Sequence, residues 1–234
     1  AVGKLAQGED PKSITFVFVT PLSKGKAWRA TKADKGPDDW IAKKKNVGTW
    51  KDVIVIDGTQ LVNWLTHFPG AACELTGAIH GCTSGFETAE MRWEALSFMP
   101  SGLRLKESLF IEGRSVAQKK VEELVRAESP SKLRVATVFS ASTVADFVSA
   151  CIVALPSDVR PKLNGRVLIL RDATTFEKLC KLDEPHVFVA DFELDLERGQ
   201  NLLDKAVAHG HSLIYSDAQE GCYGPESVEL RSPK

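Results

Sequence analysis

The stretch KLRVATVFSASTVADFVSACIVAL, from Lys132 to Leu155, indicates the fold of this chain. It starts with an apolar run rich in β-branched residues, which predicts a buried strand. A turn of small residues follows, and then a long apolar run that predicts a buried helix ending at Pro156. A strand, a turn and a helix form the repeating unit of α/β proteins, so we expect a parallel sheet covered by helices.

Three more short apolar runs in the second half predict strands. These strands are Arg166–Asp172, His186–Asp191 and Ser212–Asp217, and helical patterns alternate with them over Ser115–Val125, Thr174–Leu182 and Asn201–Gly210. Continuous apolar runs are typical of strands in a parallel sheet that is buried on both faces. The spacing of Ser115 with Gln118 predicts a capping box at the first helix, and that of Thr174 with Glu177 predicts another.

The first half alternates in the same way. Strands are expected over Ser13–Thr20 and Asp52–Gly58, and helices over Asp38–Asn46 and Thr59–Phe68. The second helix has apolar residues at i, i+3, i+4 and i+7, and either Asp57 or Thr59 is expected to cap it.

We therefore expect an α/β protein of two three-layer modules with mostly parallel sheets. The first module covers residues 1–70 and the second covers residues 106–234. Residues 71–105 are poor in pattern and rich in small side chains, so they are expected to form a connector. This connector is predicted to hold a helix or two, near Ala71–Ile79 and Ala89–Ser97.

The composition is that of an ordinary globular chain of 234 residues with a formal net charge of −1. No apolar run approaches the ~20 residues of a membrane span, so no membrane contact is expected. The five cysteines are odd in number and form no C-x-x-C pair, which favours reduced thiols and a cytoplasmic location. Their spacing fits no standard metal site. We expect no metal, no cofactor and no catalytic set, so the chain alone is not expected to be an enzyme.

The turn after the Lys132 strand stands where nucleotide-binding proteins place a phosphate loop. Such a loop needs glycines, so that backbone N–H groups can approach the phosphates, and a lysine to meet their charge. This turn has neither, although the helix start still offers free N–H groups. If the turn contacts a nucleotide, the residues involved are Ser140, Ser142 and Thr143. Capping of the helix by Ser142 or Thr143 explains both hydroxyls as well, and we favour that interpretation.

Asp191 ends the apolar run HVFVAD, and it is the fourth candidate residue for nucleotide binding. In P-loop nucleotide hydrolases an aspartate presented in this way orients magnesium. An aspartate is also common at a turn or a helix start. Because the phosphate-loop lysine is missing, we favour a structural cap.

The segment from Lys24 to Lys51 is basic, although the whole chain is nearly neutral. It holds nine positive residues and three acids, with three tryptophans interleaved. Positive charge meets phosphates and exposed aromatic rings stack on bases, which makes nucleic acid a candidate partner. A solvated loop over packed tryptophans is the alternative. The candidate nucleic-acid-binding residues are Lys24, Lys26, Arg29, Lys43, Lys44, Lys45 and Lys51.

The second half resembles the nucleotide-hydrolase module of the signalling type that sits in the middle of large bacterial multidomain proteins. The matching stretches are IEGRSVAQKKVEELV, KLRVATVF at the position of the phosphate-loop strand, RVLILRD and HVFVAD, within roughly Leu109–Asp217. In that family a Gly-Arg pair opens the helix before the phosphate-loop strand, and Gly113-Arg114 stand there. Since the phosphate loop is missing, the resemblance implies a degenerate, nucleotide-free version of the fold.

The first half resembles the C-terminal part of a restriction-endonuclease-like core of the Mrr type, over about Ser13–Phe68. TFVFVTPLSKGKAW matches a strand that ends in threonine and the helix after it, and DVIVIDGTQLVNWL matches the next strand, its Asp-Gly turn and its closing helix. In that family the metal-binding acids and the lysine lie on a hairpin upstream, which AVGKLAQGED is not expected to supply. The resemblance therefore implies no catalytic residue here, and Asp57 is interpreted as part of a turn.

Together the two resemblances imply a non-catalytic regulatory or nucleic-acid-contacting region of a bacterial restriction or phage-defence protein. Its partners would then include other domains of a larger protein. Two alternatives remain: part of a metal-dependent DNA nuclease whose catalytic residues lie outside this chain, and a nucleotide-sensing module without hydrolysis. Likeness of fold does not fix function, so each is an expectation.

Overall fold

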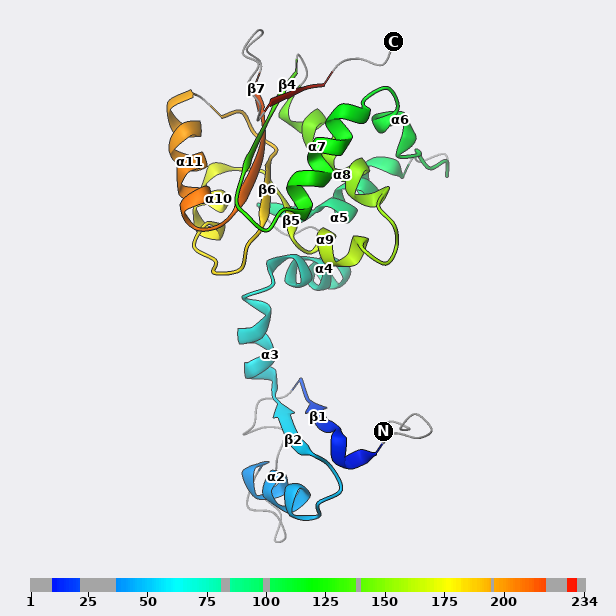
Figure 1. Cartoon of the computed structure of the whole chain (residues 1–234), viewed down its shortest axis with the longest axis vertical. Coiled ribbons are helices and arrows are strands. Elements are labelled where there is room, and N and C mark those ends of the chain that lie inside the picture. The colour runs from blue at the N-terminus through cyan, green and yellow to red at the C-terminus, as the bar shows by residue number, and fades with distance from the viewer. Residues whose placement is uncertain are drawn as a thin grey trace. The chain divides into compact units, whose positions relative to one another are not determined.

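The computed structural model describes residues 10–21, 37–80, 85–98, 102–137, 140–194, 196–217 and 227–230. The chain divides into two compact units, Ala1–Thr66 and His67–Lys234 (Figure 1). Each unit has its own sheet, and all strand pairs but one are parallel. The prediction of an α/β fold with mostly parallel sheets is confirmed.

The first unit is built on two parallel strands, β1 (Thr15–Val19) and β2 (Asp52–Ile56). Its other described elements are the 3-10 helix η1 (Pro11–Ser13) and the helices α2 (Pro37–Asn46) and α3 (Gly58–Leu65). Helix α2 packs on one face of the strand pair, where the ring of Phe18 lies 5.8 Å from that of Trp40. Val53 and Val55 are buried on this face.

The opposite face of the strand pair remains exposed. Alternate residues of a strand point to opposite faces, and Val17 pairs with Ile54 in the register of the two strands. Val17, Val19 and Ile54 are 46%, 52% and 44% exposed. The described residues of the first unit therefore form two layers instead of the three that were expected, because helix α2 covers only one face.

Helix α3 starts as the sequence predicts. The side chain of Asp57 accepts a hydrogen bond from the backbone N–H of Gln60 at 2.9 Å, and the Gln60 side chain accepts one from the Asp57 N–H at 3.0 Å. This capping box confirms Asp57 as the cap. The helix ends at Leu65, and its apolar stripe lies partly in solvent, since Trp64 is 57% exposed.

The second unit contains a six-stranded sheet in the order β3-β5-β6-β7-β4-β8. Only the edge strand β3 runs antiparallel to its neighbour. From β4 the chain crosses to β5, with room for two strands between them, and then returns through β6 and β7 to the side of β4. The strands are β3 (Phe86–Thr88), β4 (Lys132–Ala136), β5 (Val167–Leu170), β6 (Val187–Ala190), β7 (Ser212–Asp217) and β8 (Ser227–Glu229).

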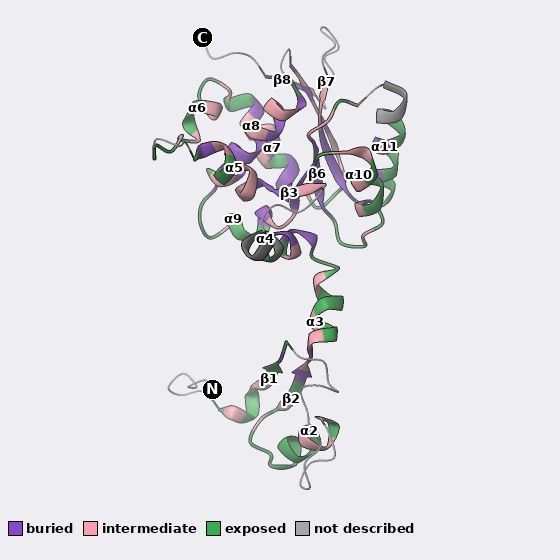
Figure 2. Cartoon of the chain, turned by 180° about the vertical axis from the view of Figure 1, so that it is seen from behind, coloured by how far each residue is buried: buried purple, intermediate pink, exposed green. Residues whose placement is uncertain are grey.

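Helices cover both faces of this sheet, as expected for a three-layer module (Figures 1 and 2). One face carries α10 (Ala173–Leu179) and α11 (Leu196–Ala208). The other carries α5 (Ala89–Ser97), α7 (Ser115–Arg126), α8 (Ala141–Val153) and α9 (Arg160–Asn164). The remaining helices of this unit are α4 (Pro69–His80) and α6 (Ser108–Ile111).

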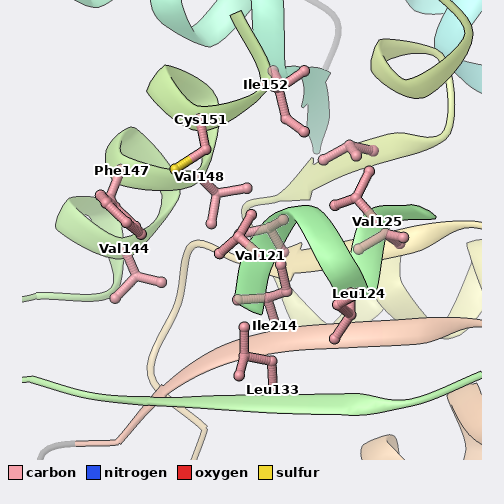
Figure 3. Packing of buried hydrophobic residues seen from close by; sticks show 14 of the residues in the cluster. Val121, Leu124, Val125, Leu133, Val144, Phe147, Val148, Cys151, Ile152 and Ile214 are labelled. Atoms are coloured by element: carbon pink, nitrogen blue, oxygen red, sulfur yellow. The ribbon is translucent and has the colours of Figure 1, made fainter. Parts of the chain in front are cut away.

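The central strands are buried on both faces, which explains their continuous apolar runs. In β5, Val167 and Ile169 belong to one hydrophobic cluster, while Leu168 and Leu170 belong to a second cluster on the opposite face. Figure 3 shows the first cluster, where α8 packs against α7 and the sheet. The apolar helix that the sequence predicted therefore lies at the centre of the module, with Phe147 fully buried.

Residues 71–105, expected to be a connector, hold α4, β3 and α5, and β3 pairs with β5 in the sheet. Helix α4 also packs closely against Gly165, at the end of α9, because a Cβ at Gly70 would lie 2.5 Å from the carbonyl oxygen of Gly165. The two helices predicted within this stretch are confirmed as α4 and α5. Strand β3 was not predicted, because three residues are too few to show an alternating pattern.

Two predicted capping boxes are wrong. Helix α7 has Arg114 at its N-cap without a side-chain cap, and helix α10 is capped by Asp172, which accepts from the backbone N–H of Thr175 at 2.8 Å. In both cases the residue predicted as the cap lies inside the helix. The capping spacing alone does not fix the first residue of a helix.

Candidate functional site

The candidate site lies at the carboxyl ends of β5 and β6, next to the start of α8. Asp191 directly follows β6, and Ser142 lies in the first turn of α8. The Ser142 hydroxyl donates a hydrogen bond of 2.6 Å to Asp191 Oδ1. In α/β sheets, ligands bind at the carboxyl ends of the strands, so this contact lies where a site is expected.

Arg92 of α5 connects the other charged groups at this edge. Its Nη1 donates to Asp191 Oδ2 at 2.9 Å and to Glu87 Oε1 at 3.2 Å, and its Nε donates to Asp146 Oδ1 at 2.6 Å. Arg171, just after β5, donates from Nη2 to Glu87 Oε2 at 2.9 Å. We call these five charged residues, together with Ser142, the Arg92 network.

The Arg92 network is mostly shielded from water. The side chains of Glu87 and Asp191 are only 5% and 8% exposed, and that of Arg92 is 18% exposed. Burial disfavours the charged guanidinium, but the hydrogen bond and charge of Asp146, with the charges of the other acids, outweigh it and raise the pKa of Arg92. Arg92 therefore stays protonated, and each acid has a cationic partner, as buried charges require.

The structure brings together two of the four predicted nucleotide-binding residues, Ser142 and Asp191. Ser140 and Thr143 instead face each other, with their hydroxyl oxygens 3.3 Å apart. The prediction that Ser142 or Thr143 caps α8 is wrong, because the N-cap is Ser140 and it makes no side-chain capping bond. The prediction that Asp191 serves as a cap is also wrong, since its carboxylate bonds to two side chains.

Sequence reasoning missed Arg92, Glu87 and Asp146. One signal was available: Asp146 is the only charged residue in the apolar helix α8, and a charge on a buried helix needs a partner. The partner could not be identified from the sequence, because Arg92 is 54 residues away from Asp146.

The basic segment is only partly described, and the candidates Lys24, Lys26 and Arg29 lie outside the described residues. The other four candidates, Lys43, Lys44, Lys45 and Lys51, are exposed. Lys43 pairs with Asp39 at 3.1 Å and Lys45 with Asp52 at 2.7 Å, while Lys44 Nζ lies 5.7 Å from the centre of the Trp40 ring. The hydrogen bond from Lys45 lowers the pKa of Asp52. Acids of the same unit therefore offset part of the charge.

A second polar region lies at the amino ends of β6 and β7. The backbone N–H of His186 donates to Nδ1 of His211 at 3.2 Å, and Nε2 of His211 lies 3.3 Å from the carbonyl oxygen of Cys180. Nδ1 of His186 lies 2.6 Å from the carbonyl oxygen of Glu184. His186 and His211 are 4% and 0% exposed, and burial lowers the pKa of both. Both rings are therefore neutral.

His186 also borders a cavity of about 750 Å³ whose other walls come from α4, α9 and the end of α7. Three cations and three acids line this cavity besides the histidines, so its charge favours no class of ligand. They are Arg126, Lys162, Arg166, Glu128, Asp158 and Glu184. Among the described residues, no group of three or more acids, histidines or cysteines is placed to hold a metal ion.

Comparisons with known proteins leave the structure itself as the evidence for function: no family model, no curated protein and no solved structure matches this chain. Within the part of the chain that the structure describes, no helix has the length and apolar character to cross a membrane.

Proposed function

We propose that this chain is a non-catalytic regulatory region of a bacterial restriction or phage-defence protein, and that its second unit is a degenerate NTPase-like module. The observation that carries this proposal is that both carboxylate oxygens of Asp191 already accept hydrogen bonds from side chains of the chain itself. One oxygen accepts from Ser142 and the other from Arg92. The proposed partners are other domains of a larger protein in the cytoplasm. The buried cysteines of the described residues, Cys73, Cys151 and Cys180, suit a reducing compartment.

The chemistry of nucleotide hydrolysis explains why this arrangement favours a non-catalytic role. In P-loop hydrolases the magnesium ion is held by a serine or threonine of the phosphate loop and by an aspartate at the end of a strand. Ser142 and Asp191 have the corresponding places, at the start of a helix and at the end of a strand. However, they bond directly to each other, and no lysine stands between Thr137 and Asp146 to meet phosphate charge.

Calorimetric titration of the chain with ATP and magnesium tests this proposal, together with an assay for released phosphate. We expect no binding and no hydrolysis. A Kd near ~1 μM, which corresponds to about −8 kcal/mol, would contradict it and would favour the nucleotide-sensing alternative.

A second candidate function is weak contact with nucleic acid through the segment Lys24–Lys51. The observation that favours it is the exposed last turn of α2, where three consecutive lysines follow one another. If about four side chains of the segment neutralise phosphates, log K should fall with log[salt] at a slope of roughly −3.6 on duplex DNA. Replacement of Lys43, Lys44 and Lys45 by alanine should flatten the slope to roughly −0.9.

The matched control for this experiment replaces three exposed lysines of the second unit, Lys119, Lys178 and Lys181, and should leave the slope unchanged. Equal slopes for both triple variants would remove this candidate function. The nuclease alternative is not favoured by Asp57, which is 5% exposed and caps α3. Plasmid cleavage by the purified chain with Mg²⁺, lost on Asp57→Ala, would revive that alternative.

A further inference from the structure

Three carboxylates from three separate elements converge on a single guanidinium group in the second unit. Glu87 comes from β3, Asp146 from α8 and Asp191 from the end of β6. All three bond to Arg92, at 3.2, 2.6 and 2.9 Å respectively. Two of these partners are 54 and 99 residues away from Arg92 in sequence, so the cluster is assembled by the tertiary fold.

The position of Ser142 fixes the geometry on the α8 side. Ser142 and Asp146 are four residues apart and lie on the same face of the helix. Ser142 reaches one oxygen of Asp191 while Arg92 bridges the other oxygen to Asp146. The helix start and the end of β6 are therefore joined by one direct hydrogen bond and one cationic bridge.

The Arg92 network differs from an ordinary surface ion pair because its acidic side chains are mostly buried. Without Arg92, the only cation of the network would be Arg171, whose side chain is 42% exposed and bonds to Glu87 alone. Asp146 and Asp191 would then be shielded carboxylates without a cation. Carboxylate and hydroxyl oxygens at the end of a strand and the start of a helix are the ligand types that Mg²⁺ prefers. Around the guanidinium, however, these acids are not placed to hold a metal ion. An ion would therefore bind only where Arg92 is removed and the oxygens move closer together.

We propose that Arg92 is a built-in cation that stands in the place of a divalent metal ion, and so fastens β3 and α5 to the sheet in one nucleotide-independent arrangement. The guanidinium supplies directional donors to three acids, where a metal ion would supply its coordination sites. This inference rests on the proposed function, since a regulatory module without nucleotide chemistry needs another means of holding this edge together.

Thermal unfolding of the full chain tests the inference, with Arg92→Ala as the main variant and Mg²⁺, Mn²⁺ or Ca²⁺ as probes. The parent Tm should not respond to these ions beyond a potassium control of matched ionic strength. Arg92→Ala should unfold about 6–20 °C lower. A divalent ion at about ten times its Kd should then raise the Tm of this variant by about 3–5 °C.

Three further variants make the test decisive. Arg92→Lys retains one charge without the planar fork, so it should fold, lose part of the Tm and regain part of it with divalent ions. Arg171→Ala is the matched control, because Arg171 contacts only Glu87 among the acids of the network, and its Tm should not respond to divalent ions. Arg92→Ala combined with Asp191→Asn should lose the response to metal.

The outcomes separate this inference from the proposed function. A parent Tm that rises with Mg²⁺ alone, or Arg92 variants that show no response to divalent ions, would overturn the inference while leaving the proposed function intact. Tight binding of ATP by the parent would overturn the proposed function, whatever the Arg92 variants show.

Discussion

The six-stranded sheet buries polar groups in opposite ways at the two ends of its strands. We call the side where the parallel strands end the carboxyl edge, and the side where they begin the amino edge. At the carboxyl edge, the acids Glu87 and Asp191 accept hydrogen bonds from the guanidinium of Arg92, and Glu87 also pairs with Arg171. At the amino edge, His186 and His211 are discharged, and their ring nitrogens lie at hydrogen-bond distance from backbone groups. One edge compensates charge and the other avoids it.

This difference shows which edge can respond to a ligand. Two neutral rings bonded to backbone groups contribute to stability but offer little for an ion to recognise, whereas a compensated ion network can exchange one cation for another. The comparison therefore predicts that mutations at the carboxyl edge change stability by removing charges. Mutations at the amino edge are predicted to change how stability depends on pH.

The largest effect is expected where one charge of the network is removed alone. Arg92→Met should lower the free energy of unfolding by about 3–5 kcal/mol, because it leaves shielded carboxylates without their cation. Urea unfolding of the parent and the variant measures the loss. Arg171→Met, at a side chain that is 42% exposed, should cost less than about 1 kcal/mol and is the control.

A variant that removes the charges together sharpens this result. If compensation is what matters, most of the lost stability should return when the acids are made neutral as well. The substitutions to combine are Arg92→Met, Glu87→Gln, Asp146→Leu and Asp191→Asn. A combined variant less stable than Arg92→Met alone would mean that the charges at this edge are stabilising in themselves.

The amino edge should lose stability in mild acid. The folded-state pKa values of His186 and His211 lie below the ordinary value, so the unfolded chain binds protons first as the pH falls below about 6.5. From about pH 7.5 to about pH 5.5, each histidine can cost up to about 1.4 kcal/mol, or about 2.7 kcal/mol for both. Urea unfolding across this range measures the decline.

The double variant His186→Gln, His211→Gln should flatten this part of the pH profile relative to the parent, since carboxylates that titrate nearby are common to both proteins. His209 is exposed and provides the comparison, because His209→Gln removes only a minor influence on the pKa of His211 and should change the profile far less than the double variant. An unaltered profile in the double variant would mean that the amino edge tolerates protonation.

The fold was largely predictable from the sequence, because each central strand is a continuous apolar run. Val187–Ala190 is buried on both faces, and its unbroken apolar run predicts that burial. Strand β3 was not predictable, since its three residues form an edge strand among small residues. The order of the strands was also hidden, because it depends on pairings between distant segments.

Two of the six residues of the candidate site were predictable. Ser142 and Asp191 follow from their positions after a strand and at the end of a strand, and both positions are visible in the sequence. Arg92 lies in a stretch with little pattern, and its meaning comes only from partners on other elements. An ion network between distant segments produces no local spacing pattern, so it could not be predicted from the sequence.

The smallest effect is expected from the Ser142 hydroxyl. Ser142→Ala removes the 2.6 Å hydrogen bond to Asp191 but leaves Arg92 on the other oxygen, so we expect a loss of about 1.5 kcal/mol, the lower end for a bond to a charged group. Ser149→Ala is the matched control on the same helix. The Ser149 hydroxyl donates a hydrogen bond of 2.8 Å to the Ala145 carbonyl oxygen. This is a neutral bond inside α8, so Ser149→Ala should cost less than Ser142→Ala.

In the Arg92→Ala background Ser142→Ala should also weaken the response to divalent ions, whereas Ser149→Ala should not. If the two serine variants behave alike in both backgrounds, Ser142 is only a helix residue with a convenient neighbour, and the carboxyl edge depends on Arg92 alone.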